Sequence, residues 1–164
     1  MSSVRPLLHL VPDPAEPTPL VSFCGHCGQA PPTPMAARSR VCALCGLGVV
    51  ITASADLAPQ KGESFLIVDR QLKLCALSRG AERVLGVDEP EAVHRPVTDF
   101  LEPADAEAGH GDELLHRIIS SAAIGFAPPH SIVVRPTGEY GVRYAARVGS
   151  CGPPEGALIV LGTV

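Results

Sequence analysis

The sequence has little aromatic content and no tryptophan. Because aromatic residues make up only 4% of its 164 residues, the core has to be built from aliphatic side chains, and few rings are available to stack on bases. Lysine and arginine total 13 against 17 acids, a formal net charge of -4, whereas nucleic-acid binders are normally basic. No apolar run reaches the length of a membrane span. These absences favour a soluble protein that is not a general nucleic-acid binder.

Cysteine is placed in a pattern that indicates a metal site. Cys24 and Cys27 form one Cys-x-x-Cys pair, Cys42 and Cys45 form another, and a glycine directly follows each pair. Two such pairs complete a tetrahedron of thiolates, and a glycine with positive φ lets backbone N–H groups turn toward the sulfurs. We predict one structural zinc ion held by these four residues. With four protein ligands no position is open for a catalytic water, so the ion should stabilise the fold.

Two disulfides and a redox-active Cys-x-x-Cys pair are the alternatives to a metal site. The first 19 residues contain five prolines and no continuous apolar segment, so no secretory signal is predicted. The chain is therefore expected to be cytoplasmic, with reduced thiols. A redox pair would open a helix after a strand, whereas Cys24 follows a proline-rich stretch. His26, inside the first pair, is predicted to be a solvent-facing spacer and not a ligand.

The composition changes along the chain and predicts four segments. Residues 1–20 are predicted to be a disordered, proline-rich tail, because frequent proline removes backbone donors. Residues 21–51 form the predicted zinc ribbon. Residues 52–62 are small and polar and are predicted to be a linker. The remainder, 63–164, is predicted to be one α+β unit.

Hydrophobic periodicity gives the expected elements of this unit. The continuous apolar runs 65–68 and 157–161 are typical of strands covered on both faces. Residues 72–77 alternate with the period of a strand. Ser78 can cap a short helix that Gly86 ends. Short helical turns are expected at 89–93 and 97–101, a longer amphipathic helix at 112–124, and a hairpin of two strands at 131–135 and 140–148.

This order of elements resembles a PAS domain over residues 63–164. The segments that carry the resemblance are 65–70 (Phe-Leu-Ile-Val-Asp-Arg), 78–86 (Ser-Arg-Gly-Ala-Glu-Arg-Val-Leu-Gly) and 95–101 (Arg-Pro-Val-Thr-Asp-Phe-Leu). The resemblance implies a five-stranded antiparallel sheet in which the first and last strands lie side by side. It also implies helices that close one face of the sheet over a small pocket, and a role as a sensory or dimerisation module.

The sequence lacks the marks of the PAS subfamilies whose cofactors are known. The Asn-Cys-Arg-Phe motif of the flavin-binding photoreceptors is absent, and Cys75 (on a predicted strand) and Cys151 (in a predicted loop) are expected to be ordinary thiols. His116 lies on the predicted long helix, where haem-binding members place a ligand, but about 130° from the centre of the apolar stripe. Neither haem nor flavin is expected, and the pocket ligand stays open. The other histidines, His94, His110 and His130, are expected to be solvated or structural.

The predicted function is that of a non-enzymatic signalling or regulatory protein. No glycine-rich phosphate loop or nucleophile–base spacing is present, and Asp99, Glu102 and Asp105 are expected on a solvated surface. No output segment follows the last predicted strand, so a protein partner or a second copy is expected to bind through the ribbon, the tail or the PAS surface. The alternative is a transcription-associated protein that contacts DNA or RNA polymerase through the ribbon, where Arg38 and Arg40 are its local support.

Overall fold

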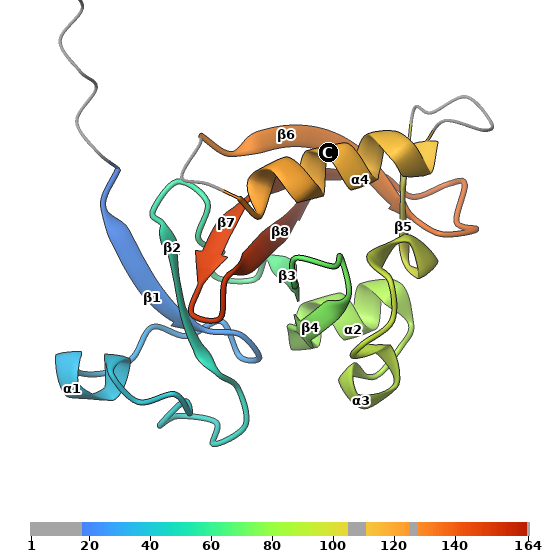
Figure 1. Ribbon diagram of the computed structural model, residues 1–164. Helices are drawn as coiled ribbons and strands as arrows, with labels where there is room; N and C mark the ends of the chain where they lie inside the picture. Colours follow the sequence, from blue (N-terminus) through green and yellow to red (C-terminus); the bar gives the residue numbers. More distant parts are fainter. Residues whose placement is uncertain (1–17, 105–110, 125–127, 164) are drawn as a thin grey trace, which may run out of the picture.

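The computed structural model describes residues 18–104, 111–124 and 128–163. It is an α+β structure built on one antiparallel sheet with the strand order β1-β2-β7-β8-β3-β4, in which β6 also pairs with β7 and β5 with β6 (Figure 1). The strands are β1 (Leu20–Cys24), β2 (Val50–Ser54), β3 (Ser64–Val68), β4 (Leu74–Leu77), β5 (Leu101–Pro103), β6 (His130–Pro136), β7 (Tyr144–Gly152) and β8 (Gly156–Thr163). The helices are α1 (Pro34–Ala37), α2 (Arg79–Leu85), α3 (Glu89–Ala92), the 3₁₀ helix η1 (Val97–Asp99) and α4 (Gly111–Ala122).

The two uninterrupted apolar runs lie side by side in the middle of the sheet. Residues 64–68 of β3 pair with residues 157–161 of β8 in antiparallel register. The apolar runs predict that both strands are covered on both faces, and the resemblance implies that they are neighbours. Successive side chains of a strand point to opposite faces. Leu66 and Val68 therefore enter one buried cluster, while Phe65 and Ile67 enter another on the opposite face.

Helices α2, α3, η1 and α4 cover the first of these two faces. Figure 1 shows α4 lying across the sheet and α2 and α3 gathered at its other end. Leu115 and Ile119 of α4 are buried in the same cluster as Leu66 and Val68. The ends of α2 are those the sequence predicts, since the Ser78 side chain accepts a hydrogen bond from the Ala81 amide and Gly86 ends the helix with a φ of 64°.

The β1–β2 hairpin covers part of the opposite face. The sheet branches at β7, whose first half pairs with β6, while its end pairs with β2 at Thr52↔Gly152 and Ala53↔Cys151. From this junction the hairpin curls over β3 and β8. Phe23 of β1 meets Phe65 of β3 edge to face, with ring centroids 5.6 Å apart at 90°. The predicted ribbon and the following unit thus share one sheet and one buried cluster.

The predicted linker at 52–62 differs from the structure. Residues 52–54 belong to β2, and Leu57 is only 1% exposed, packed in the cluster that joins the hairpin to the sheet. A Cβ built on Gly149 of β7 would lie 2.7 Å from Leu57 Cδ2, so the strand approaches this side chain as closely as a glycine permits. One isolated leucine among small and polar residues has no periodicity, which is why the sequence pattern misses it.

Two further elements differ from their predicted positions. The strand predicted at 140–148 begins at Tyr144 and continues to Gly152. Cys151, predicted in a loop, therefore lies within β7 and is buried. The helical turns predicted at 97–101 are the 3₁₀ helix η1 followed by β5, a three-residue strand too short to show a period of two. Within the described ranges no helix is both long and apolar enough to cross a membrane.

Replacing Leu57 by alanine is expected to destabilise the protein by about 2–5 kcal/mol, because it leaves a cavity between the hairpin and the sheet. Chemical denaturation of the metal-loaded protein measures this loss. Leu47→Ala is the matched control, since Leu47 is 70% exposed and its truncation should change the free energy of unfolding by less than about 0.5 kcal/mol. Equal losses in the two variants would contradict the docking of the hairpin described here.

Candidate metal centre

The first Cys-x-x-Cys pair forms a tight turn at the end of β1. The amide of Gly28 donates to the carbonyl of Cys24 over 2.9 Å, and Gly28 has a φ of 72°. This turn directs the amides of His26 and Cys27 toward the Sγ of Cys24, each at 3.4 Å. Positive φ is the conformation that glycine adopts without steric cost, so the residue after the pair has the role that the sequence predicts.

The second pair repeats this turn. The amide of Gly46 donates to the carbonyl of Cys42 over 2.9 Å, and Gly46 has a φ of 69°. The Leu44 amide lies 3.4 Å from Cys42 Sγ, and the Gly48 amide lies 3.5 Å from Cys45 Sγ. The two turns therefore present their thiols in the same way, with backbone donors that stabilise thiolates.

The four thiols converge on one point. All four Sγ atoms lie within 4.8 Å of one another, with Cys24 Sγ 3.6 Å from Cys45 Sγ and Cys27 Sγ 3.9 Å from Cys42 Sγ. Zinc–sulfur bonds of about 2.3 Å in a regular tetrahedron place the sulfurs about 3.8 Å apart. The donor set and its spacing therefore fit one tetrahedral zinc ion, as the sequence predicts.

The electrostatics of the thiols explain why a cation is needed. Burial raises the pKa of Cys24 to about 12 and also raises the pKa of Cys27. The amide of Gly48 is the main cause that lowers the pKa of Cys45 to about 6. A buried thiolate is costly without an opposite charge. A divalent cation bound there would supply that charge, and the hairpin and the ion would then stabilise each other.

Gly48 is a residue of this centre that the sequence analysis did not single out. A Cβ built on Gly48 would lie 2.3 Å from Cys24 Sγ and 2.8 Å from the backbone nitrogen of His26. The second turn therefore lies against the first at this position. The sequence signal for Gly48 is the second glycine of Cys45-Gly-Leu-Gly48. A single knuckle needs only the glycine that directly follows its cysteine pair, so this second glycine indicates another close contact.

His26 is buried, and the prediction of a solvent-facing spacer is wrong. Its side chain lies between the ribbon and the helices, where the guanidinium Nε of Arg79 donates to its Nε2 over 3.2 Å. Its Nδ1 lies 3.3 Å from a carboxylate oxygen of Glu89, outside hydrogen-bond geometry. The Arg79 amide also donates to the His26 carbonyl over 3.3 Å. His26 is therefore a contact between the first knuckle and α2 and α3, outside the group of four sulfurs.

The remaining candidate residues that the structure describes do not gather into a second site. His94, His116 and His130 are exposed, and so are Cys75 on β4 and the ribbon arginines Arg38 and Arg40. Asp99 pairs with Arg95 over 3.0 Å, and Glu102 pairs with Arg135 over 2.8 Å, so both acids serve in ion pairs. His110 and Asp105 lie outside the described residues.

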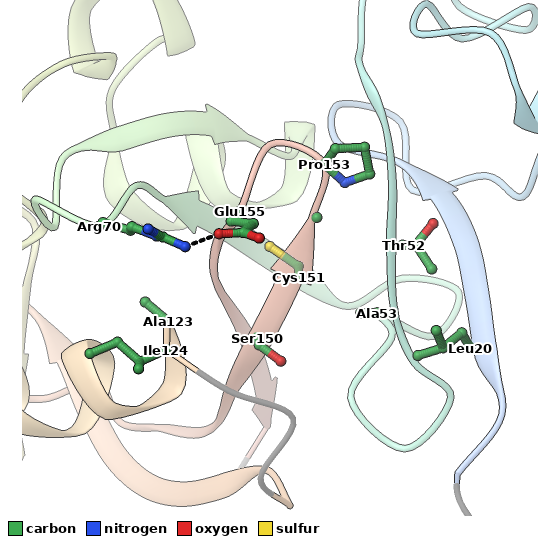
Figure 2. A pocket seen from close by; sticks show the side chains of 11 residues that line it. Leu20, Thr52, Ala53, Arg70, Ala123, Ile124, Ser150, Cys151, Pro153 and Glu155 are labelled. Carbon is green, nitrogen blue, oxygen red and sulfur yellow. Dashed lines mark hydrogen bonds and ion pairs between the residues drawn. The ribbon is translucent and has the colours of Figure 1, made fainter.

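The helices pack on one buried cluster, and a cavity of about 430 Å³ opens near the β1–β2 hairpin. Figure 2 shows this cavity between the hairpin, the end of β7 and the end of α4, with the ion pair of Arg70 and Glu155 at one side. Cys151 lines it, and burial raises the pKa of this thiol to about 12. The thiol stays protonated at neutral pH, which makes it a poor nucleophile.

Comparisons with known proteins identify no family for the chain. No protein-family model matches it, and no curated protein matches it in sequence. Among solved structures it is similar to a chain of the crystal structure of the E. coli DhaR(N)-DhaL complex, with 18% sequence identity and a TM-score of 0.40. The match covers 65% of this chain and 33% of that chain, so it spans about a third of the neighbour's length. At this level the likeness establishes neither a shared fold nor a shared function.

Proposed function

We propose that this chain is a non-enzymatic signalling or regulatory protein of the cytoplasm, in which a PAS-type module is coupled to a zinc ribbon that binds a partner protein. The observation that carries the proposal is the exposed apolar surface of the ribbon. It is formed by large side chains on residues 35–49 that the fold leaves in solvent: Met35, Val41, Leu44, Leu47 and Val49.

This apolar surface supports protein binding because the fold keeps large apolar side chains in contact with solvent. Leu44 and Leu47 belong to the second knuckle, are 56% and 70% exposed, and flank Cys45. A metal-bound turn is rigid, so these side chains are presented in a fixed arrangement. Contiguous exposed apolar surface marks interaction sites in soluble proteins, and these side chains come from one short segment, residues 35–49. In this proposal the zinc ion fixes the surface that a partner protein contacts, and the ion takes part in no reaction.

The strand arrangement supports the PAS-type module. Five strands follow the order β4-β3-β8-β7-β6, the first and last of them in sequence (β3 and β8) are neighbours, and the helices lie on one face. The adjacency of β3 and β8 and the helices on one face are features that the sequence resemblance implies. Because the hairpin covers the other face around Phe65 and Leu158, that part of the sheet is closed to self-association.

The contacts of His26 connect the zinc ribbon to helices α2 and α3 of the PAS-type module. His26 joins the first knuckle to Arg79 at the start of α2 and to Glu89 at the start of α3. Glu89 also accepts a hydrogen bond from the Leu77 amide of β4 over 3.0 Å. A ligand or partner that favours a different position of α2 or α3 would therefore also change the stability of the first knuckle.

The test is a pull-down with the zinc-loaded full chain as bait, compared with the double variant Leu44→Asp and Leu47→Asp. We expect the variant to retain one metal per chain and to lose at least one partner that the unmodified chain recovers. Tyr140→Asp is the control, because Tyr140 is exposed but lies outside the ribbon. Recovery of the same proteins by bait and double variant, or a monomer that recovers none, would refute the proposal.

The alternative is a transcription-associated protein that contacts DNA or RNA polymerase through the ribbon. It is favoured by the exposure of both Arg38 and Arg40 on the loop between the knuckles. DNA binding that weakens steeply with salt and disappears on replacing both arginines by alanine would select this alternative.

A further inference from the structure

A second cavity, of about 350 Å³, lies where the zinc ribbon meets the helices. It opens between the first knuckle (26–29), the loop 60–63 and the start of α2, and all of these segments belong to the described residues. Its lining is about half polar. The residues that carry the argument are Gln29, Gln60, Lys61, Glu63, Arg79 and Arg83.

Three cationic side chains converge on this cleft from two separate segments. Lys61 comes from the loop, and Arg79 and Arg83 lie four residues apart on α2, where they share one side of the helix. Arg79 donates its Nε to His26, which leaves its two terminal nitrogens without a partner among the described residues. Among the described residues, the side chains of Lys61 and Arg83 have no hydrogen bond and no ion pair.

The acid in the lining is already neutralised. Both oxygens of Glu63 accept hydrogen bonds from the guanidinium of Arg147, at 3.0 and 2.8 Å, and one of them also accepts from the Gln60 amide over 2.8 Å. The hydrogen bonds from Arg147 are the main cause that lowers the pKa of Glu63. The nearby carboxylate of Glu89 is held by the Leu77 amide and lies against His26. The cleft therefore has an excess of positive charge within a chain that is negative overall.

We propose that this cleft binds a small molecule that carries a phosphate group. Arginine guanidinium groups bind phosphate oxygens in pairs, and a lysine ammonium adds a point charge. The side-chain amides of Gln29 and Gln60 offer further donors at the mouth. The volume falls within the range of small-molecule sites, so there is room for more than the phosphate alone.

This site goes beyond the proposed function, because binding needs no partner protein. A bound phosphate would touch the first knuckle and α2 at once, at the place where His26 already links them. The ligand would therefore stabilise the contact between the ribbon and the rest of the fold, and its binding should raise the thermal midpoint of the zinc-loaded protein.

The test is calorimetric titration of the zinc-loaded full chain with two probes, inorganic phosphate and phenyl phosphate. We expect saturable binding, weakened about tenfold or more by Arg83→Gln and by Lys61→Gln, because each removes a charge-assisted contact. Arg38→Gln removes the same charge from an exposed arginine outside the cleft and should leave the affinity within about twofold. Tighter binding of phenyl phosphate identifies a phosphoester as the preferred form, and equal binding identifies the free ion.

Backbone amide chemical shifts locate the bound phosphate. We expect shift changes at residues 26–29, 60–63 and 78–83, the three segments around the cleft. The proposal is overturned if neither probe binds at millimolar concentration. It is also overturned if Arg83→Gln and Arg38→Gln weaken binding equally, or if the shift changes gather at residues 38–40, because binding would then reflect surface charge alone.

Discussion

Replacing Cys24 by serine is expected to abolish zinc binding and to destabilise the whole protein. Cys24 is fully buried and receives two backbone amides at its Sγ, so no other ligand can take its place. Structural zinc contributes about 10–16 kcal/mol of apparent binding free energy in zinc-finger peptides, which exceeds the total stability of many domains. Because the β1–β2 hairpin covers Phe65 and Leu158, its loss also exposes one face of the central strands.

Elemental analysis and thermal unfolding measure this effect. The unmodified chain should contain one zinc ion, chelation should lower its unfolding midpoint sharply, and added zinc should restore it. Cys75→Ser is the matched control, because Cys75 is exposed on β4 and away from the four sulfurs. A Cys24→Ser variant that retains stoichiometric zinc, or a chelated protein with an unchanged midpoint, would show that the cysteine cluster does not hold the fold together.

Replacing Gly48 by alanine is expected to disrupt the centre although every ligand remains. The added Cβ would lie 2.3 Å from Cys24 Sγ and 2.8 Å from both Cβ and the backbone nitrogen of His26. The sulfur cannot move without leaving the tetrahedron, and the backbone of the first knuckle is fixed by its own turn. We expect a loss of about 3 kcal/mol or more, at the upper end of overpacking effects, and at least a tenfold loss of zinc affinity.

Competition with a chelator of known affinity measures the change in zinc binding. Gly141→Ala is the control, because a Cβ at Gly141 would meet nothing within 4 Å, and it should keep the affinity and the unfolding midpoint. If Gly48→Ala binds zinc as tightly as the Gly141→Ala variant, the two knuckles do not lie against each other as described.

The parts of this structure that local pattern determines were predictable from the sequence. The four ligands follow from the spacing of Cys24, Cys27, Cys42 and Cys45, since each turn needs only its own residues and a glycine. That β3 and β8 are strands covered on both faces follows from runs that are apolar at every position, whereas their pairing is what the PAS resemblance implies. Ser78 and Gly86 mark the ends of α2 through equally local contacts.

The contacts that join the ribbon to the sheet were not predictable, because they depend on residues distant in sequence. Leu57 is a single apolar residue in a polar stretch, and nothing near it indicates that Gly149 will lie beside it. The burial of His26 depends on Arg79 and Glu89, 53 and 63 residues further along the chain. A spacing pattern carries no information about such partners.

The branch point at β7 also determines the order in which the molecule can be assembled. The β1–β2 hairpin is translated well before the strand end to which it pairs, residues 151 and 152. Until then Phe23 and Ile51, which face each other across the hairpin, lack the apolar cover that Leu158 and Val160 provide. Zinc captured by the nascent chain would hold the hairpin in its final shape through this interval, so metal supply during translation should govern the yield of folded protein.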